Sequence, residues 1–355
     1  MSIRYSHQIF APAATRRVFL GHSAAVVAST FVPGTMGTAL AQGKPMMWKS
    51  VIQHRNGASY KKWLWLQEEL PKRTGGRLTL ELATIPELGL TGTEVLRVLK
   101  TGLIDVAEVL TGYVASDFPM IEATDLPGVA TSYSQSRQLY DAWAASVVAK
   151  REDVMGGKTL ATFCWGQMYL YTKSPLNSLS DLKGKKIRNF APAQARYLGA
   201  LGAEPISMTT SEVYSALQRG VIDGTITGAD QVKGMSIHEV VKHISNINIA
   251  PLGSYIVASR RSWDKLPVDV QKVLGEIGPE LTDLGWKLGE DNNQEGLALA
   301  REKGMTVDPV AKAGWPSVLT KISSEQIVPW WVGRAGPAAR EAFNQYLAPI
   351  TGVKV

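Results

Sequence analysis

Residues 181–228 read DLKGKKIRNFAPAQARYLGALGAEPISMTTSEVYSALQRGVIDGTITG, a stretch that predicts three strands separated by two helices. Gly202 and Gly220 stand where left-handed helix caps are expected, and Thr209 with Glu212 forms a capping box for the second helix. Strands that alternate with helices of this length favour parallel pairing with crossover helices. The predicted strands are residues 185–190, 205–208 and 225–227, and the first predicted helix is 193–201.

Two polar residues of this stretch fall at predicted strand ends. Arg188 lies near the end of the first strand, and Thr227 lies at the end of the third. Open α/β sheets bind ligands outside the carboxyl ends of their strands. The ligand site is therefore predicted here.

The stretch also resembles an earlier segment of the chain, so the sequence contains an internal repeat, called here the sequence echo. The segment TGTEVLRVLKTGLIDVAEVLTG from Thr91 matches TTSEVYSALQRGVIDGTITG from Thr209, 118 residues later. Both copies carry a capping box, an apolar helix stripe, a stop glycine and an Ile-Asp entry into the next strand. A single shift of this length is far longer than a solenoid period. It predicts two related lobes with a cleft between them.

Composition places the chain among globular proteins. It has 355 residues, of which 45% are hydrophobic and 19% charged. A chain of this length can form two hydrophobic cores. The net charge is +7, but no run of lysine and arginine marks a nucleic-acid-binding face. We therefore expect no nucleic-acid partner.

The first 41 residues are expected to be a twin-arginine export signal. Arg16 and Arg17 are followed by Val-Phe-Leu and a modest apolar stretch, and small residues at Ala39 and Ala41 provide a cleavage site before Gln42. The apolar stretch is short and contains proline, so it does not predict a permanent membrane anchor. The mature protein is expected in the periplasm, cleaved after Ala41.

Few residues suggest catalysis. Cys164 is the only cysteine, so it cannot form an intramolecular disulfide, and we expect it to be buried and inert. His238 and His243 are five residues apart and do not share a helix face well. No nucleophile elbow, phosphate loop or metal-ligand cluster is recognisable, so we expect no enzyme activity, no cofactor and no metal.

The rest of the chain continues the α/β pattern. We expect a strand at 47–54, a helix at 60–70 ended by Pro71, and a long strand from 159 to 172 that passes from the first lobe to the second. The apolar, strand-rich segment 245–259 should lead the chain back to the first lobe. A helix over 266–303 should brace both lobes, and Pro279 should break or kink it. The tail from residue 307 should add two or three short helices, with Trp330 and Trp331 between them.

These motifs together resemble one family. Residues 181–224 resemble the substrate-binding proteins of TRAP transporters, the DctP family. The resemblance is carried by three motifs, Asp181-Leu182-Lys183-Gly184-x-Lys186-Ile187-Arg188, Leu201-Gly202-Ala203-x-Pro205 and Glu212-Val213-Tyr214-x-Ala216-Leu217-Gln218-x-Gly220-Val221-Ile222-Asp223-Gly224. The resemblance extends over most of the mature chain. It also includes Gly75-Gly76-Arg77, Phe118-Pro119 and Trp263-Asp264-Lys265-Leu266-Pro267.

The resemblance implies an α/β fold of two lobes, joined by hinge strands and a long helix, that closes on an organic anion. It also implies a membrane permease as partner, driven by an ion gradient. We expect one lobe to contain residues 42–165 and about 254–293, and the other 166–253 and about 294–355. Alternative functions are a binding protein of an ATP-driven importer, a sensor partner, or a periplasmic enzyme.

The family also implies particular site residues. Its arginine at the end of the LKGxKIR strand clamps the substrate carboxylate, and that position is Arg188. Thr227 falls where family members often have a ligand-contacting asparagine. By the same alignment, four further residues face the cleft, although loop packing is an equally good account of them; they are His54, Asn56, Thr111 and Thr210.

One departure bears on specificity. Many members carry a second arginine two residues after a glycine, and the corresponding positions here are Gly166 and Met168, with Trp165 beside them. A second fixed cation is therefore absent at this position. Methionine and tryptophan offer a soft, aromatic-compatible wall instead. The sequence thus favours a monocarboxylate over a dicarboxylate.

Overall fold

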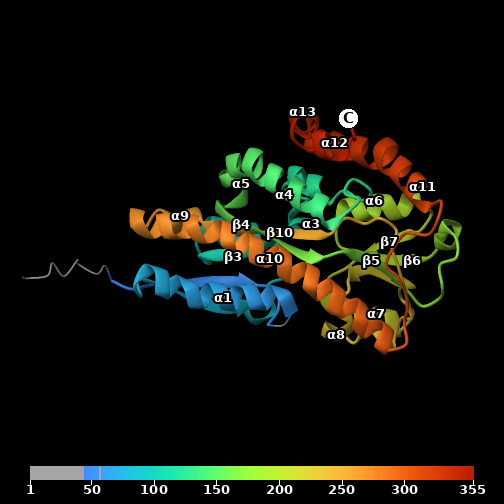
Figure 1. Ribbon diagram of the computed structural model, residues 1–355, viewed down its shortest axis with the longest axis horizontal. Coiled ribbons are helices and arrows are strands. Elements are labelled where there is room, and N and C mark those ends of the chain that lie inside the picture. The colour runs from blue at the N-terminus through green and yellow to red at the C-terminus, as the bar shows by residue number, and fades with distance from the viewer. Residues whose placement is uncertain (1–43, 56) are drawn as a thin grey trace, which may run out of the picture. The chain divides into compact units, whose positions relative to one another are not determined.

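The structure contains two β-sheets with helices packed around them (Figure 1), and four strands of each sheet follow the same order. The computed structural model describes residues 44–55 and 57–355, so the predicted export signal and Asn56 lie outside the described residues. The first sheet has the order β2-β1-β3-β10-β4, and the second has the order β7-β6-β8-β5-β9-β11. In each sheet three parallel strands are followed by an antiparallel one, β10 or β5. The fold is therefore a two-lobed α/β fold, as predicted.

The strands of the first sheet are β1 (Met46–Ile52), β2 (Leu78–Thr84), β3 (Val106–Leu110), β4 (Gly157–Gly166) and β10 (Leu252–Ser259). Those of the second are β5 (Met168–Thr172), β6 (Lys186–Asn189), β7 (Glu204–Ser207), β8 (Gly224–Gly228), β9 (His243–Ser245) and β11 (Thr306–Asp308). The α-helices are α1 (Gly57–Thr74), α2 (Val95–Thr101), α3 (Thr111–Val114), α4 (Tyr133–Ser146), α5 (Glu152–Met155), α6 (Pro192–Ala200), α7 (Thr210–Gln218), α8 (Gln231–Gly234), α9 (Arg260–Trp263), α10 (Val268–Glu302), α11 (Trp315–Ile322), α12 (Val328–Ala335), α13 (Pro337–Ala342) and α14 (Ala348–Thr351).

The two copies of the sequence echo fold alike. The Glu94 carboxylate accepts the Thr91 backbone N–H at 3.0 Å, and the Glu212 carboxylate accepts that of Thr209 at 2.9 Å. Each helix then ends at a glycine with positive φ, 71° in the first copy and 73° in the second. At Thr209 the bond to Glu212 belongs to a capping box that begins α7, as predicted. Helix α2 instead begins after Glu94 without a capping box, so the box predicted for the first copy is wrong.

The aspartate of each Ile-Asp pair has the same role in both copies. Asp105 accepts the backbone N–H of Lys49 at 2.7 Å, and Asp223 accepts that of Lys186 at 2.8 Å. Each aspartate therefore ties the start of the strand that follows it to the neighbouring parallel strand, at the middle of β1 in the first sheet and at the first residue of β6 in the second. The two copies of the sequence echo therefore lie at equivalent places in the two sheets. The single 118-residue shift between them predicted such a pair of related lobes.

The chain crosses between the sheets at two points. Strand β4 belongs to the first sheet and leads within two residues into β5 of the second. Strand β9 of the second sheet is followed by β10, which pairs with β3 and β4 of the first. The long strand predicted over 159–172 is therefore two strands that meet at Gln167, and they form the first crossing. The apolar segment predicted to lead back to the first lobe forms the second.

Helix α10 contacts both sheets. A Cβ on Gly289 would lie 2.0 Å from the carbonyl oxygen of Cys164 in β4, and one on Gly296 would lie 2.3 Å from that of Ala229 after β8. Glycine at these two positions lets the helix approach both backbones closely. The prediction of a helix that braces both lobes is confirmed.

Three further details of the prediction differ from the structure. Helix α10 is continuous through Pro279, so the predicted alternative of a break is wrong, and α1 continues past Pro71 to Thr74. A proline removes one backbone bond and costs a helix about 3 kcal/mol, which packing along a long helix can outweigh. Trp330 and Trp331 lie inside α12 rather than between helices, because the tail forms more helical segments than expected.

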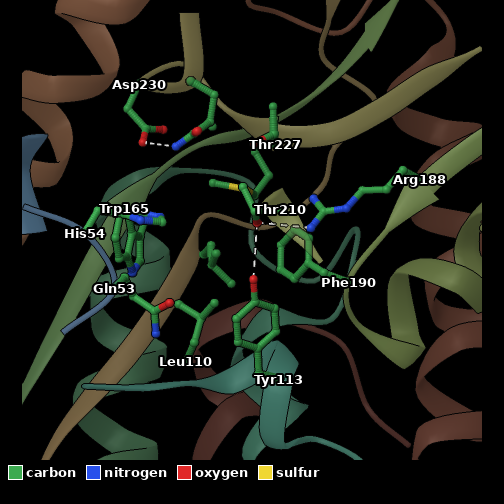
Figure 2. A pocket seen from close by; sticks show the side chains of 14 residues that line it. Gln53, His54, Leu110, Tyr113, Trp165, Arg188, Phe190, Thr210, Thr227 and Asp230 are labelled. Atoms are coloured by element: carbon green, nitrogen blue, oxygen red, sulfur yellow. Dashed lines mark hydrogen bonds between the residues drawn. The ribbon is translucent and has the colours of Figure 1, made fainter. Parts of the chain in front are cut away.

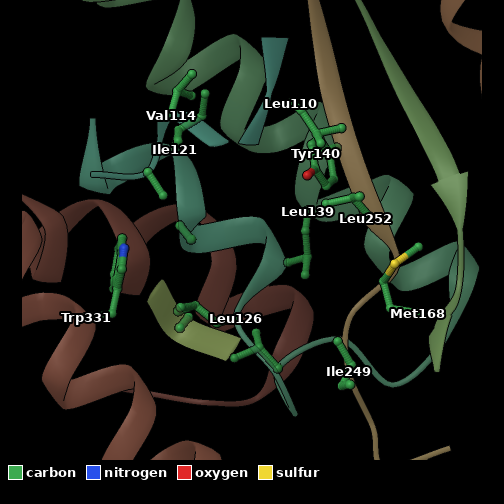
Figure 3. Packing of buried hydrophobic residues seen from close by; sticks show 14 of the residues in the cluster. Leu110, Val114, Ile121, Leu126, Leu139, Tyr140, Met168, Ile249, Leu252 and Trp331 are labelled. Atoms are coloured by element: carbon green, nitrogen blue, oxygen red, sulfur yellow. The ribbon is translucent and has the colours of Figure 1, made fainter. Parts of the chain in front are cut away.

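The apolar core lies on the faces of both sheets, and Figure 3 shows part of its largest cluster. This cluster joins α3, α4 and the loop before β10 to Trp331 of the tail. The indole N–H of Trp331 donates to the carbonyl of Pro119 at 2.8 Å, and Arg334 pairs with Glu122 at 3.2 Å. In the described part of the chain, no helix combines the length and apolar character needed to cross a membrane.

Candidate functional site

A cavity lies between the two sheets, where several strands end (Figure 2). The space free of protein atoms here is about 450 Å³ when the open solvent at its mouth is included. Its walls come from the carboxyl ends of β1, β3, β6 and β8 and from both crossings, as expected for ligand sites in open α/β sheets. The lining residues are Gln53, His54, Leu110, Tyr113, Trp165, Met168, Arg188, Phe190, Thr210, Thr227, Gly228, Asp230, Gln231 and Leu252.

Arg188 is a buried cation whose three protein partners are uncharged. Only 1% of the residue is exposed. Its Nε donates to the carbonyl of Met208 at 3.0 Å, Nη1 to that of Ile226 at 3.1 Å and Nη2 to Thr210 Oγ1 at 3.2 Å. Burial lowers the pKa of Arg188 to about 10, which leaves it protonated at neutral pH. One N–H on each Nη is left over, which matches the two oxygens of a carboxylate.

The backbone explains how Arg188 is held. Strand β6 places it opposite Ile206 of β7 and Thr225 of β8, between two parallel neighbours. Its guanidinium carbon lies 4.9 Å from the ring centroid of Phe190, two residues further on. The side chain is therefore fixed by backbone carbonyls on one side and an aromatic ring on the other.

One hydrogen bond joins the two sides of the cavity. The hydroxyls of Tyr113, in the segment after β3, and Thr210, at the start of α7, lie 3.2 Å apart. The Tyr113 ring also meets the edge of Phe190, with 6.3 Å between centroids. Because Thr210 also accepts from Arg188, the contact between the two sides includes the buried cation.

The wall beside the chain crossing is aromatic and apolar. The Trp165 ring lies 6.1 Å from that of His54 and 5.5 Å from that of Phe163, edge to face in both cases. Met168 is 2% exposed and also lines the cavity, from the first residue of β5. Burial is the main cause that lowers the pKa of His54, with Glu108 opposing it, so the imidazole is neutral at pH 7.

A buried ion pair supports this wall from behind. Lys62 Nζ lies 2.9 Å from Glu108 Oε2 and 3.2 Å from the centroid of the Phe163 ring. Glu108 also accepts hydrogen bonds from Ser59 and Ser254, at 2.9 and 2.8 Å. A buried charge without such partners would be very unfavourable, so this network keeps the charges paired beneath the aromatic residues.

A carboxylate, Asp230, also lines the cavity. It is half-buried just after β8, and it accepts a hydrogen bond from the side-chain amide of Gln231. A Cβ on Gly228 would lie 2.5 Å from Asp230 Oδ1, so glycine at this position makes room for the carboxylate. Burial raises the pKa of Asp230 to about 6, and hydrogen bonds from Gln231 oppose the shift.

The cavity brings together six of the eight residues predicted from the sequence: His54, Trp165, Met168, Arg188, Thr210 and Thr227. Thr111 does not line it. Its buried hydroxyl lies 3.1 Å from the Gly253 carbonyl and bonds Asp125, so it supports the first sheet from inside. Asn56 lies outside the described residues.

Several lining residues were not predicted from the sequence, and Tyr113 and Asp230 matter most chemically among them. Both follow the ends of parallel strands by two or three residues. The strand-end rule that selected Arg188 and Thr227 could have included them.

The described part of the chain contains no group of three His, Cys, Asp or Glu side chains placed to hold a metal ion. Cys164 is buried, and burial raises the pKa of its thiol to about 12. The predicted burial of this cysteine is confirmed, and the high pKa keeps it protonated and unreactive.

Comparisons with known proteins give a consistent result. The family model for bacterial extracellular solute-binding proteins, family 7 (DctP), matches residues 51–327. The C4-dicarboxylate-binding periplasmic protein DctP of Rhodobacter capsulatus is 29% identical over 209 residues, which are 58% of this chain and 63% of that protein. A solute-binding protein of Sulfitobacter sp. (strain NAS-14.1) is 28% identical over 294 residues, which are 79% of this chain and 85% of that protein.

A solved structure with a similar fold is DctP7, a Bordetella pertussis extracytoplasmic solute receptor binding pyroglutamic acid. It superposes with a TM-score of 0.78 at 24% identity, over 85% of this chain and 99% of that one.

Proposed function

Because the chain belongs to the bacterial extracellular solute-binding proteins, family 7 (DctP), we propose that it captures an organic carboxylate between its two lobes and delivers it to the membrane permease of a TRAP transporter. The observation that carries this proposal is Arg188. A buried cation with no carboxylate among its three protein partners, and with an N–H left on each Nη, suits a ligand carboxylate. The role is binding and delivery without catalysis.

The proposed lobes are residues 42–165 with about 254–293, and 166–253 with about 294–355. Strand membership of the two sheets supports this division for the strands, while the tail also contacts the first lobe through Trp331 and Arg334. A ligand held by Arg188 on one side and by Trp165 and His54 on the other would favour the closed arrangement, because it binds both lobes at once. The Tyr113–Thr210 contact would form in that arrangement.

We propose a monocarboxylate as the preferred class of ligand. Met168 and Trp165 occupy the wall where many relatives have a second arginine, and Arg188 is the one arginine or lysine among the described residues that line the cavity. A second ligand carboxylate would therefore lack a fixed cation. Thr210 and Thr227 would supply hydroxyl groups for polar substituents.

The test is calorimetric titration with pairs of acids that differ by one carboxylate, such as butyrate and succinate. The wild-type protein should prefer the monocarboxylate. Arg188→Ala should weaken binding by about 30-fold or more, the usual effect of removing one partner of a buried charge pair. Arg196→Ala is the matched control, because this arginine is exposed on α6.

Two results would contradict the proposal. Retention of affinity within about threefold in Arg188→Ala would remove Arg188 from the site, and tighter binding of dicarboxylates would refute the argument from Met168. Small-angle scattering should show a smaller radius of gyration with ligand than without it. An unchanged radius at saturation would exclude lobe closure.

We also propose that the protein acts in the periplasm after cleavage behind Ala41. The family's extracellular assignment and the twin-arginine pattern at Arg16 and Arg17 support this. The intact mass of the exported protein should correspond to a chain that begins at Gln42. A cytoplasmic, uncleaved product would contradict the proposal.

A further inference from the structure

The cavity contains two opposite charges that do not pair with each other. Arg188 and Asp230 both line it, and Figure 2 shows them on different sides of the space. The Arg188 guanidinium bonds two backbone carbonyls and a threonine hydroxyl. The Asp230 carboxylate accepts from the side-chain amide of Gln231. Each charged group therefore has only neutral protein partners in these bonds.

The other titratable groups near the cavity do not balance Asp230. The Lys62 ammonium is paired with Glu108 behind Phe163 and Trp165. Burial keeps His54 neutral. Lys61 and Lys233 share a second hollow with Asp230, and neither forms an ion pair with it among the described residues. A ligand that offered a carboxylate alone would satisfy Arg188 and leave Asp230 facing a second negative charge.

In the part of the chain that the structure describes, the surroundings of Asp230 leave space for its carboxylate but give it no role in capping a helix or in an ion pair. Gly228 makes room for its Oδ1 atom, since a Cβ there would lie only 2.5 Å away. Helix α8 directly after it has only four residues, and the Asp230 side chain makes no cap bond to it. A half-buried carboxylate that neither caps a helix nor pairs with a lysine has acceptor capacity left for a ligand.

We propose that Asp230 is a specificity-determining residue that accepts a hydrogen bond from an N–H group of the ligand, so that the ligand carries both a carboxylate and an N–H donor. This inference rests on the proposed function, because it takes the Arg188 end of the cavity as the carboxylate site. An ammonium or a lactam nitrogen would meet the requirement. A ligand with both groups pairs the buried charge of Arg188 and the half-buried charge of Asp230, and a charge removed from water without a partner is unfavourable.

The experiment uses matched pairs of probes that differ at one atom, titrated calorimetrically into the full mature protein. One pair is L-pyroglutamate and its lactone analogue, in which oxygen replaces the ring N–H. The other is L-proline and tetrahydrofuran-2-carboxylate, which tests an ammonium in the same way. The wild-type protein should prefer the N–H member of at least one pair by about 10- to 100-fold, as for a hydrogen bond to a charged group.

Three variants separate the possible causes of a preference. Asp230→Ala should reduce it to within about threefold while leaving the affinity for the oxygen analogue unchanged or higher. Asp230→Asn keeps an acceptor oxygen but no charge, so it should weaken binding of the ammonium probe more than that of the lactam. Glu295→Gln is the matched control, because Glu295 lines the second hollow but not the cavity, and it should leave the preference intact.

The outcomes also separate this inference from the proposed function. Equal affinity for both members of each pair in the wild-type protein, or an undiminished preference in Asp230→Ala, would overturn the role of Asp230. A preference for hydroxy acids alone, or equal loss of both pair members in Asp230→Ala, would do the same. If nitrogen-free carboxylates bind and Arg188→Ala abolishes that binding, the proposed function stands even where this inference fails.

Discussion

Lys62 offers the sharpest test of how the cavity wall is supported. Its ammonium lies 2.9 Å from Glu108 and 3.2 Å from the Phe163 ring centroid, and both charged side chains are almost inaccessible, at 1% and 0% exposure. Lys62→Met would keep the volume of the side chain and remove the charge. Glu108 would then be left ionised and buried, with hydroxyl and indole donors but no counter-charge.

Breaking a buried pair by removing one partner costs about 3–5 kcal/mol of unfolding free energy. The entropy of unfolding scales with chain length, so this loss corresponds to a fall in Tm of roughly 5–8 °C for a chain of this size. Adding Glu108→Gln should recover at least half of the loss, because glutamine still accepts from Ser59 and Ser254 without an uncompensated charge.

The assay is urea denaturation at pH 7, followed by tryptophan fluorescence, on the wild type, both single variants and the double variant. The double-mutant cycle should give a coupling energy of at least about 1.5 kcal/mol. A loss below about 1 kcal/mol in Lys62→Met, or a double variant less stable than both single variants, would refute the argument that the pair is held together by mutual compensation.

Two further predictions concern the lobe contact and a buried carboxyl group. Tyr113→Phe removes the hydroxyl that lies 3.2 Å from Thr210 Oγ1, so ligand affinity should fall by about 2- to 10-fold in calorimetry. Unchanged affinity would show that this bond does not stabilise the closed form. Burial raises the pKa of Asp125 to about 7, with bonds from Thr111 and Tyr140 opposing the shift, so the folded state holds a proton that the unfolded state releases near pH 4. The contribution of Asp125 to stability should therefore be largest below about pH 4 and fall by up to about 4 kcal/mol as the pH rises to 7. Asp125→Asn should remove this contribution, so the change in unfolding free energy between pH 5 and 8 should differ from that of the wild type in urea denaturation. An equal slope in the variant would assign the pH dependence to other groups.

Local signals in the sequence were enough to predict the strand–helix succession. The Thr209–Glu212 capping box and the stop glycines involve residues at most a few positions apart, so their geometry is decided within one turn of chain. The same signals failed at Pro71 and Pro279. There the local preference to end a helix is outweighed by packing against distant strands, which a local pattern does not contain.

The sequence by itself determined the repeated α/β unit, its two copies and the position of Arg188 at a strand end. Only the tertiary structure decided what faces Arg188 across the cavity. Tyr113 and Thr210 are 97 residues apart in the chain, and the donors around Glu108 come from α1 and β10. Likewise, Thr111 proved to be a buried hydroxyl that bonds Asp125, and Asp230 proved to line the cavity. The physical reason is that strand periodicity and helix caps are short-range properties, whereas the burial and pairing of a charge depend on which distant segments meet around it.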